Sequence, residues 1–196
     1  MMSYTTLMKG CVLTAALLIT ACAQSPQAIQ VAPEFPAPTQ VNGDGNPVHV
    51  RVSDQRANKV LGSRGGAYRE TSVITLANDL SLPVETALSA YMGAMGYDVN
   101  SLDPNTTNVH VIFSSLVYDH PKEDGLGYDM DMMAGVEVEV RRGNEHYEGR
   151  YRIKRNQKFF NAPSNSHNSK LVNDLVAEVL ISMFSDPKLV AFLKRN

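Results

Sequence analysis

Residues 11–20 (CVLTAALLIT) form an apolar run that is followed within two residues by a cysteine, Cys22, and then by polar sequence. A run of about ten residues is far shorter than the roughly 20 residues that a membrane-spanning helix needs. Lys9 and the amino end place positive charge ahead of the run, which is the arrangement of a secretory signal peptide. We therefore expect residues 1–21 to be removed on export and the rest of the chain to fold outside the cytoplasm.

The residues before the cysteine are small, as a signal peptidase that holds an extended backbone requires. Ile19-Thr20-Ala21-Cys22 resembles the lipobox of bacterial lipoproteins, in which the cysteine receives diacylglycerol and becomes the first processed residue. We expect lipidation at Cys22, with three acyl chains that hold the protein on a membrane where one chain would bind only marginally. The alternative is an ordinary signal peptide with an unmodified cysteine. By resemblance to lipoprotein sorting, Ala23 implies passage to the outer membrane, with the domain facing the periplasm.

Cysteine usage and charge exclude several classes of protein. The chain has 2 cysteines, Cys11 in the signal peptide and Cys22 at the lipid site, so the processed domain has no thiol left for a disulfide. The net charge is -2 and no long basic run appears, so nucleic acid is not an expected partner. With 196 residues, the chain is long enough for one domain with its own core.

The sequence between the cysteine and the domain is rich in proline. Residues 22–46 are predicted as a tether, which would reach on the order of 70 Å as polyproline or about 30 Å as a coil. The apolar side chains of Ile29, Val31 and Phe35 favour the alternative, in which part of this segment docks as an edge strand. The domain itself is predicted to occupy residues 47–196.

The hydrophobic pattern of the domain predicts an α+β fold. Period-two runs predict strands at 48–52, 71–77, 109–118, 128–141 and 146–158, and the first two could pair as a long hairpin. Apolar residues at helical spacing predict helices at about 82–95 and 166–184, with a short last helix after Asp186-Pro187. The order ββ-α-βββ-αα predicts a two-layer sandwich, with a mostly antiparallel sheet of about five strands and the helices on one face.

The last two strands allow a prediction of register. With Asn144 and Glu145 at the centre of the turn, opposite charges face each other in the pairs Arg141–Glu148, Glu139–Arg150 and Glu137–Arg152. A shift by two residues would set Glu139 against Glu148, which is unfavourable by a few tenths of a kcal/mol or more. We therefore expect the first register.

Two groups of basic residues are candidates for binding. Arg56, Arg64 and Arg69 surround the sequence Gly62-Ser63-Arg64-Gly65-Gly66, which lacks the spacing of a phosphate-binding loop and is predicted as a wide loop between strands. These arginines could recognise an anionic group or an acidic partner. The second group lies on the outer face of the last strand and consists of Arg150, Arg152, Lys154 and Lys158.

The second group has two interpretations. It forms either a solvated face or a surface for lipopolysaccharide phosphates, peptidoglycan carboxylates or a protein partner. Lys154 and Lys158 have no evident cross-strand acid, which favours binding.

Residues for metal binding or catalysis are not clustered in the sequence. The histidines lack metal-ligand spacing, and Asp119-His120 and Asp129-Met130-Asp131 are expected to be solvated loop and strand-edge residues. Ser114 and Ser115 lie in a strand without the turn that exposes a nucleophile. We expect no metal, no cofactor and no enzymatic activity.

Several segments in a fixed order resemble one known family. They are Cys22 in its lipobox, IQVAPEFPAP, VHVRVSDQR, GSRGGAYRETSVITL, AMGYDV and LVNDLVAEVLISMFSDPKLVAFL. Together they resemble the YajG family of proteobacterial lipoproteins over essentially the whole processed chain. The resemblance implies an outer-membrane lipoprotein, and we expect a non-catalytic binding or scaffolding module of the envelope. The alternative is a hydrolase or small-molecule binder that acts on cell-wall or lipid fragments.

Overall fold

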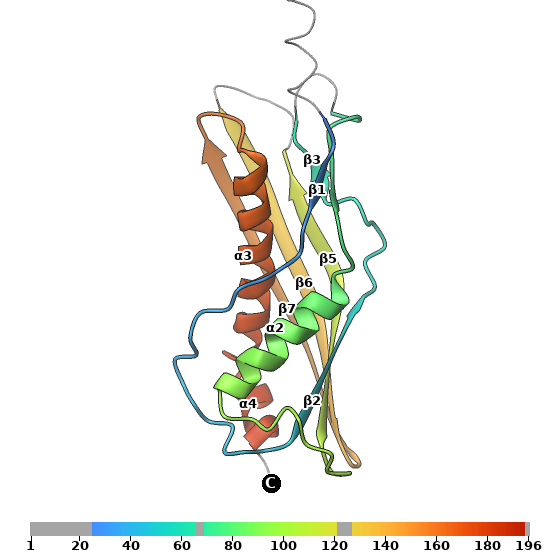
Figure 1. The fold of residues 1–196 in the computed structure, drawn as a ribbon, viewed down its shortest axis with the longest axis vertical. Coiled ribbons are helices and arrows are strands. Elements are labelled where there is room, and N and C mark those ends of the chain that lie inside the picture. Colours follow the sequence, from blue (N-terminus) through green and yellow to red (C-terminus); the bar gives the residue numbers. More distant parts are fainter. Residues whose placement is uncertain (1–24, 66–68, 121–126, 195–196) are drawn as a thin grey trace, which may run out of the picture.

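A four-stranded sheet with helices on one face forms the body of the molecule (Figure 1). The computed structural model describes residues 25–65, 69–120 and 127–194, so Cys22 and the expected signal peptide lie outside the described residues. The strand order of the large sheet is β2-β5-β6-β7, with bounds Val48–Asp54, Thr107–Asp119, Tyr128–Arg142 and Glu145–Phe159. The helices are α2 (Ser81–Ala94), α3 (Asn165–Met183) and α4 (Pro187–Lys194). Helix α2 packs on β2, and α3 packs on β6 and β7.

A second, smaller sheet has the order β1-β4-β3, with bounds Gln27–Ile29, Val73–Leu76 and Gly62–Ser63. The α+β class and the helices on one face are therefore as predicted, but the single, mostly antiparallel sheet of about five strands is wrong. Two mixed sheets are present, because β1 is parallel to β4 and β2 is parallel to β5.

The predicted hairpin between residues 48–52 and 71–77 is also wrong. β2 pairs with β5 instead, and a parallel pair needs a long crossover, which here contains β3, β4 and α2. The fully buried Ile74 lies between Gln27 of β1 and Gly62 of β3, so the second predicted strand is drawn into the small sheet.

The proline-rich segment lies against the domain rather than free of it. Ile29 and Val31 are buried, and the ring of Phe35 stacks on Tyr91 with centroids 5.0 Å apart. The Val31 N–H donates to Asn78 Oδ1 at 2.8 Å, and Asn78 Nδ2 donates back to the Val31 carbonyl at 3.0 Å. We call residues 25–46 the docked segment. The alternative of an edge strand is the one that the structure adopts, so the long reach of a free tether does not apply to these residues.

The helices follow their predicted apolar faces. Val84, Leu88, Tyr91 and Met92 of α2 are buried, and the chain leaves the helix through Gly96 at a φ of 92°, a backbone conformation that glycine adopts readily. Ser164 is the N-cap of helix α3, and its side chain accepts from the His167 N–H at 3.2 Å.

The hairpin of β6 and β7 adopts the register that the charges disfavoured. Arg142 pairs with Glu145, so Gly143 and Asn144 form the turn and Glu139 lies opposite Glu148. Gly143 has a φ of 55° at the first central position, the position that a type II′ turn reserves for glycine. A tight turn fixes the strand pairing. The repulsion between like charges directly opposite each other costs only a few tenths of a kcal/mol, which is too little to change the turn. The predicted register is therefore wrong by two residues, although a shift of two leaves each side chain on its predicted face.

Strand β5 contains a bulge in the middle of the sheet. Phe113 pairs with Val136 and Ser115 pairs with Gly135, which leaves Ser114 as an extra residue. A Cβ on Gly135 would lie 2.6 Å from Ser115 Oγ, so the bulge requires glycine on the neighbouring strand.

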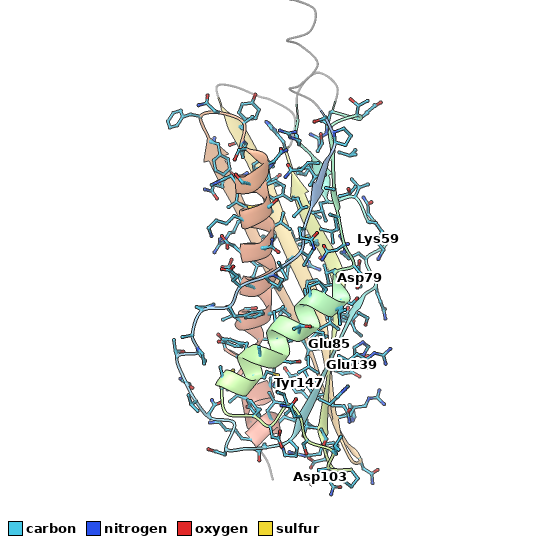
Figure 2. All side chains as sticks on the ribbon, in the orientation of Figure 1. Lys59, Asp79, Glu85, Asp103, Glu139 and Tyr147 are labelled. Carbon is cyan, nitrogen blue, oxygen red and sulfur yellow. The ribbon has the colours of Figure 1, made fainter. Side chains whose placement is uncertain are left out.

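The molecule is elongated, and its two ends differ. β1 begins, β7 ends and α3 begins at one end, which we call the β1 end (Figure 1). Asp103, in the connection between α2 and β5, lies at the opposite end (Figure 2).

Candidate functional site

A cavity of about 400 Å³ lies beside the β5 bulge. Its walls come from the chain that follows β2 and from β5, and they include Arg56, Leu61, Ser115, Leu116 and Asp119. Leu61 and Leu116 are each 2% exposed, so their apolar side chains line the cavity from the core side.

Arg56 is the charged wall of this cavity, and it is 4% exposed. Its Nε donates to Asp54 Oδ1 at 2.8 Å and its Nη2 donates to Asp54 Oδ2 at 2.9 Å. The remaining nitrogen, Nη1, is buried and has no hydrogen-bond partner among the described residues. One edge of the guanidinium is thus fixed by the ion pair, and Nη1 keeps its hydrogen-bonding capacity.

Asp54 is shared between two cations. Lys59 Nζ lies 3.0 Å from Asp54 Oδ2, in addition to the two bonds from Arg56. Burial alone would raise the pKa of Asp54, but the hydrogen bonds from Arg56 and Lys59 outweigh it and lower that pKa to about 2. At neutral pH this cluster carries two positive charges and one negative charge.

Ser115 lines the same cavity and has a second unpartnered polar atom. Its Oγ is buried and accepts or donates no hydrogen bond within the described parts of the chain. The neighbouring Ser114 Oγ, by contrast, donates to the Gly135 carbonyl at 3.3 Å. An arginine and a serine in the wall of one cavity, beside apolar residues, are side chains of the kind that bind an oxygen of a carboxylate or phosphate whose carrier has an apolar part.

The other two arginines of the first candidate group, Arg64 and Arg69, have partners elsewhere in the structure. Arg69 forms an ion pair with Asp119, whose Oδ1 also accepts from the Ser63 N–H at 2.8 Å. Arg64 Nη1 donates to the Ser25 carbonyl at 3.2 Å. The three arginines therefore do not form one ring around a loop, and Gly66 of that loop lies outside the described residues.

Asp119-His120 is not a solvated loop pair, contrary to the sequence prediction. Asp119 ends β5 in its ion pair with Arg69, and His120 is 1% exposed. The His120 ring meets Tyr128 edge-on, with centroids 5.0 Å apart. The packing of the small sheet against β5 buries His120 and partly covers Asp119, whose side chain is 27% exposed, and a local sequence pattern does not report such a contact.

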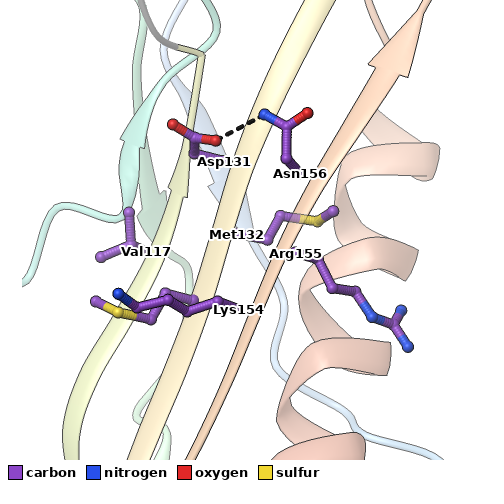
Figure 3. A pocket seen from close by; sticks show the side chains of 7 residues that line it. Val117, Asp131, Met132, Lys154, Arg155 and Asn156 are labelled. Carbon is purple, nitrogen blue, oxygen red and sulfur yellow. Dashed lines mark hydrogen bonds between the residues drawn. The ribbon is translucent and has the colours of Figure 1, made fainter.

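The outer face of the large sheet holds a hollow of about 420 Å³. Figure 3 shows Lys154 of β7 lying across β6 toward Val117 of β5, and Asn156 Nδ2 donates to Asp131 Oδ1 at 2.8 Å at its upper edge. Met133 completes this surface. Val117 also lines the cavity beside the bulge, so the two depressions adjoin.

The second candidate group is divided between paired and unpaired side chains. Arg150 Nε lies 3.3 Å from Glu137 and Lys158 Nζ lies 3.6 Å from Asp129, so the expectation that Lys158 lacks a cross-strand acid is wrong. The actual register creates this pair, because it places Asp129 directly opposite Lys158. Arg152 and Lys154 have no acidic partner within 4.0 Å in the described ranges, and both lie on the exposed outer face.

A polar cluster that the sequence did not suggest joins β7 to α4. The hydroxyls of Tyr147 and Tyr151 lie 2.6 Å apart and donate to Asp186 Oδ2 at 2.7 and 3.0 Å. Asp186 Oδ1 also accepts from the Lys188 N–H at 2.8 Å and so caps α4. Hydrogen bonding from Tyr147 is the main reason that the pKa of Asp186 is lowered. This cluster is structural, since it holds the first half of β7 on the helix layer.

Two other kinds of site have no candidate in the described ranges. No three His, Cys, Asp or Glu side chains there are grouped closely enough to hold a metal ion. None of the helices in those ranges has the length and apolarity that crossing a bilayer requires.

An α+β domain preceded by a lipobox-like cysteine defines a class, the small bacterial lipoproteins. Within that class the chain belongs to a family described as "Uncharacterized lipoprotein", whose family model matches residues 33–194. It is 26% identical over 189 residues to "Uncharacterized lipoprotein YajG" of Escherichia coli strain K12, covering 94% of this chain and 95% of that protein. The YajG of Escherichia coli O6:H1 strain CFT073 matches equally. The resemblance to the YajG family is therefore confirmed.

One solved structure supports the fold alone. The chain is similar to protein XCC0632 from Xanthomonas campestris, with a TM-score of 0.52, 7% identity, and coverage of 87% of this chain and 97% of that one. At this identity the similarity extends to the arrangement of the elements and not to the side chains of the cavity.

Proposed function

We propose that this lipoprotein is anchored in the outer membrane by lipid on Cys22, faces the periplasm, and acts as a non-catalytic binding module of the cell envelope. Its binding site is the cavity beside the β5 bulge, which receives the anionic group of a ligand. The observation that carries this proposal is that Arg56 and Ser115 both line this cavity and that each has a buried side-chain atom, Arg56 Nη1 and Ser115 Oγ, without a partner among the described residues. A buried polar group without a partner costs about 1–3 kcal/mol, and a bound oxyanion would remove that cost.

The cavity walls indicate the chemical class of the ligand. Asp54, Arg56 and Lys59 together leave one excess positive charge beside the cavity, and the wall carboxylate of Asp119 is paired with Arg69. Leu61 and Leu116 supply apolar surface. The ligand therefore carries a carboxylate or phosphate beside an apolar portion. Peptidoglycan peptides and lipopolysaccharide both contain such groups, as does an acidic segment of a protein partner.

The carboxylates near the cavity favour binding over hydrolysis. Asp119 is held by Arg69 and by a backbone N–H, and Asp54 is held by Arg56 and Lys59. With its pKa lowered to about 2, Asp54 is charged at neutral pH and has no proton to give. These groups position the guanidinium, and they are poorly suited to general acid chemistry.

The binding site is tested by titrating the processed lipoprotein with inorganic phosphate and with a purified disaccharide tetrapeptide from peptidoglycan, while recording NMR shifts. We expect saturable shifts at the Arg56 side chain and the Ser115 amide for at least one probe. Ser115→Ala should weaken binding, and Arg150→Gln on the outer face, whose side chain is 84% exposed, should leave it unchanged. If both probes give no saturable shift in the wild-type protein, the cavity is not an oxyanion site.

The anchor is tested by labelling cells with radioactive palmitate and separating inner from outer membranes. Wild-type protein should carry label and sediment with the outer membrane, whereas Cys22→Ser should do neither. Labelled protein that remains in the inner membrane would contradict the proposed location while preserving the lipid.

A further inference from the structure

The docked segment is fixed to the domain from its first described residue onward. Arg64 Nη1 donates to the Ser25 carbonyl at 3.2 Å. Gln27, which is 5% exposed, donates from Nε2 to the Asn165 carbonyl at 2.8 Å and accepts from Asn168 Nδ2 at 2.8 Å. The chain therefore joins the domain at Ser25 to Gln27, and not at residue 47.

Very little chain separates that attachment from Cys22. Cys22 stands three residues before Ser25, a span of about 10 Å when fully extended. A lipid on Cys22 must enter the bilayer, so Ser25 lies within about this distance of the membrane surface. The part of the domain around Ser25 is thereby the part nearest the lipid.

Other residues lie at this same β1 end. β7 ends and α3 begins there (Figure 1), and Gln27 bonds directly to the first residue of α3. Phe160 follows the last residue of β7 and is 100% exposed. Its neighbour Phe159 is anchored, because the Phe159 ring meets His167 edge-on with centroids 5.4 Å apart. A fully exposed aromatic side chain, next to a residue that packs on α3, thus lies at the same end of the molecule as Ser25.

We propose that the β1 end of the domain rests on the lipid bilayer and that the Phe160 side chain inserts into the lipid interface. This inference rests on the proposed lipid at Cys22. The short span to Ser25 and its fixed position determine which end meets the membrane. The apolar side chain of Phe160 is poorly solvated by water, so its transfer to the boundary between headgroups and acyl chains is favourable.

The chain contains 0 tryptophans, so one substitution gives a single fluorescent reporter. The test uses the full processed lipoprotein, carrying Phe160→Trp, in vesicles of phosphatidylethanolamine and phosphatidylglycerol that contain brominated lipids. The matched control is Leu102→Trp, because Leu102 is 99% exposed and precedes Asp103 at the opposite end (Figure 2). Both sites are exposed, so neither substitution disturbs the core.

We expect the Phe160→Trp protein to show blue-shifted emission and several-fold stronger quenching by brominated lipid than the Leu102→Trp protein. Flotation of the vesicles in a density gradient reports the anchor separately. Protein that floats but shows equal quenching at the two positions overturns the proposed orientation and leaves the lipid anchor standing. Protein that fails to float overturns the anchor, and this inference falls with it.

Discussion

Ser114 and Ser115 are adjacent serines at the β5 bulge, and substituting each by alanine should have opposite effects on stability. Ser115 Oγ is buried without a partner in the described structure, so its removal recovers part of a desolvation cost of about 1–3 kcal/mol. We expect Ser115→Ala to stabilise the protein by about 1 kcal/mol. Ser114 Oγ donates to the Gly135 carbonyl at 3.3 Å, and losing this long bond should cost about 0.5 kcal/mol.

The assay is thermal and urea unfolding of the processed protein and both variants at pH 7. For a chain of this size, 1 kcal/mol corresponds to about 2–4 °C in Tm, so the two variants should be separated by several degrees. The more stable Ser115→Ala protein should also bind oxyanion probes more weakly, because a binding group held without a partner lowers stability in the free protein and contributes affinity for the ligand. If Ser115→Ala destabilises the protein as Ser114→Ala does, the hydroxyl has a partner and the reasoning about the cavity fails.

Three further predictions test the ion pair, the tyrosine cluster and the docked segment. Because the pKa of Asp54 is lowered to about 2, its stabilising effect is complete above about pH 4 and is lost as the pH falls through 2. Urea midpoints should report a loss on the order of 1–2 kcal/mol over that range, and Asp54→Asn should lack this part of the pH dependence. Gly149→Ala should cost about 1–3 kcal/mol in thermal unfolding, because a Cβ there lies 2.6 Å from the Tyr147 hydroxyl and 2.7 Å from that of Tyr151; an unchanged Tm would contradict the packing. Asn78→Ala should speed hydrogen exchange in the docked segment relative to the wild-type protein, while exchange in β6 serves as the unchanged reference. Equal protection of the docked segment in the wild-type and variant proteins would show that the Asn78 amide does not hold it.

The helices and the faces of the long hairpin could be predicted from the sequence because periodicity reports local burial. The apolar stripe of α2 and the Asp186-Pro187 start of α4 are found where predicted. The strand register was wrong because cross-strand charges were given more weight than turn geometry. A better signal was available, since Gly143-Asn144 is a typical two-residue turn sequence.

Sheet topology and the candidate site depend on contacts between distant residues, which no local pattern encodes. The parallel pairing of β2 with β5 and the parallel pairing of β1 with β4 are of this kind. Arg56 was predicted as a candidate for binding, but as one of three arginines around a loop and not as a buried guanidinium paired with Asp54. Ser115 could not be predicted, because only the bulge and the packing around it leave that hydroxyl without a partner.

The distance along the chain between the docked segment and its partners imposes an order on folding. Gln27 bonds to Asn165, 138 residues later, and Gln30 accepts from Asn173, 143 residues later. Synthesis from the amino end produces Gln27 long before either asparagine, so we expect this segment to dock last. Closure of the small sheet and α3 on the docked segment would then mark the completion of the chain.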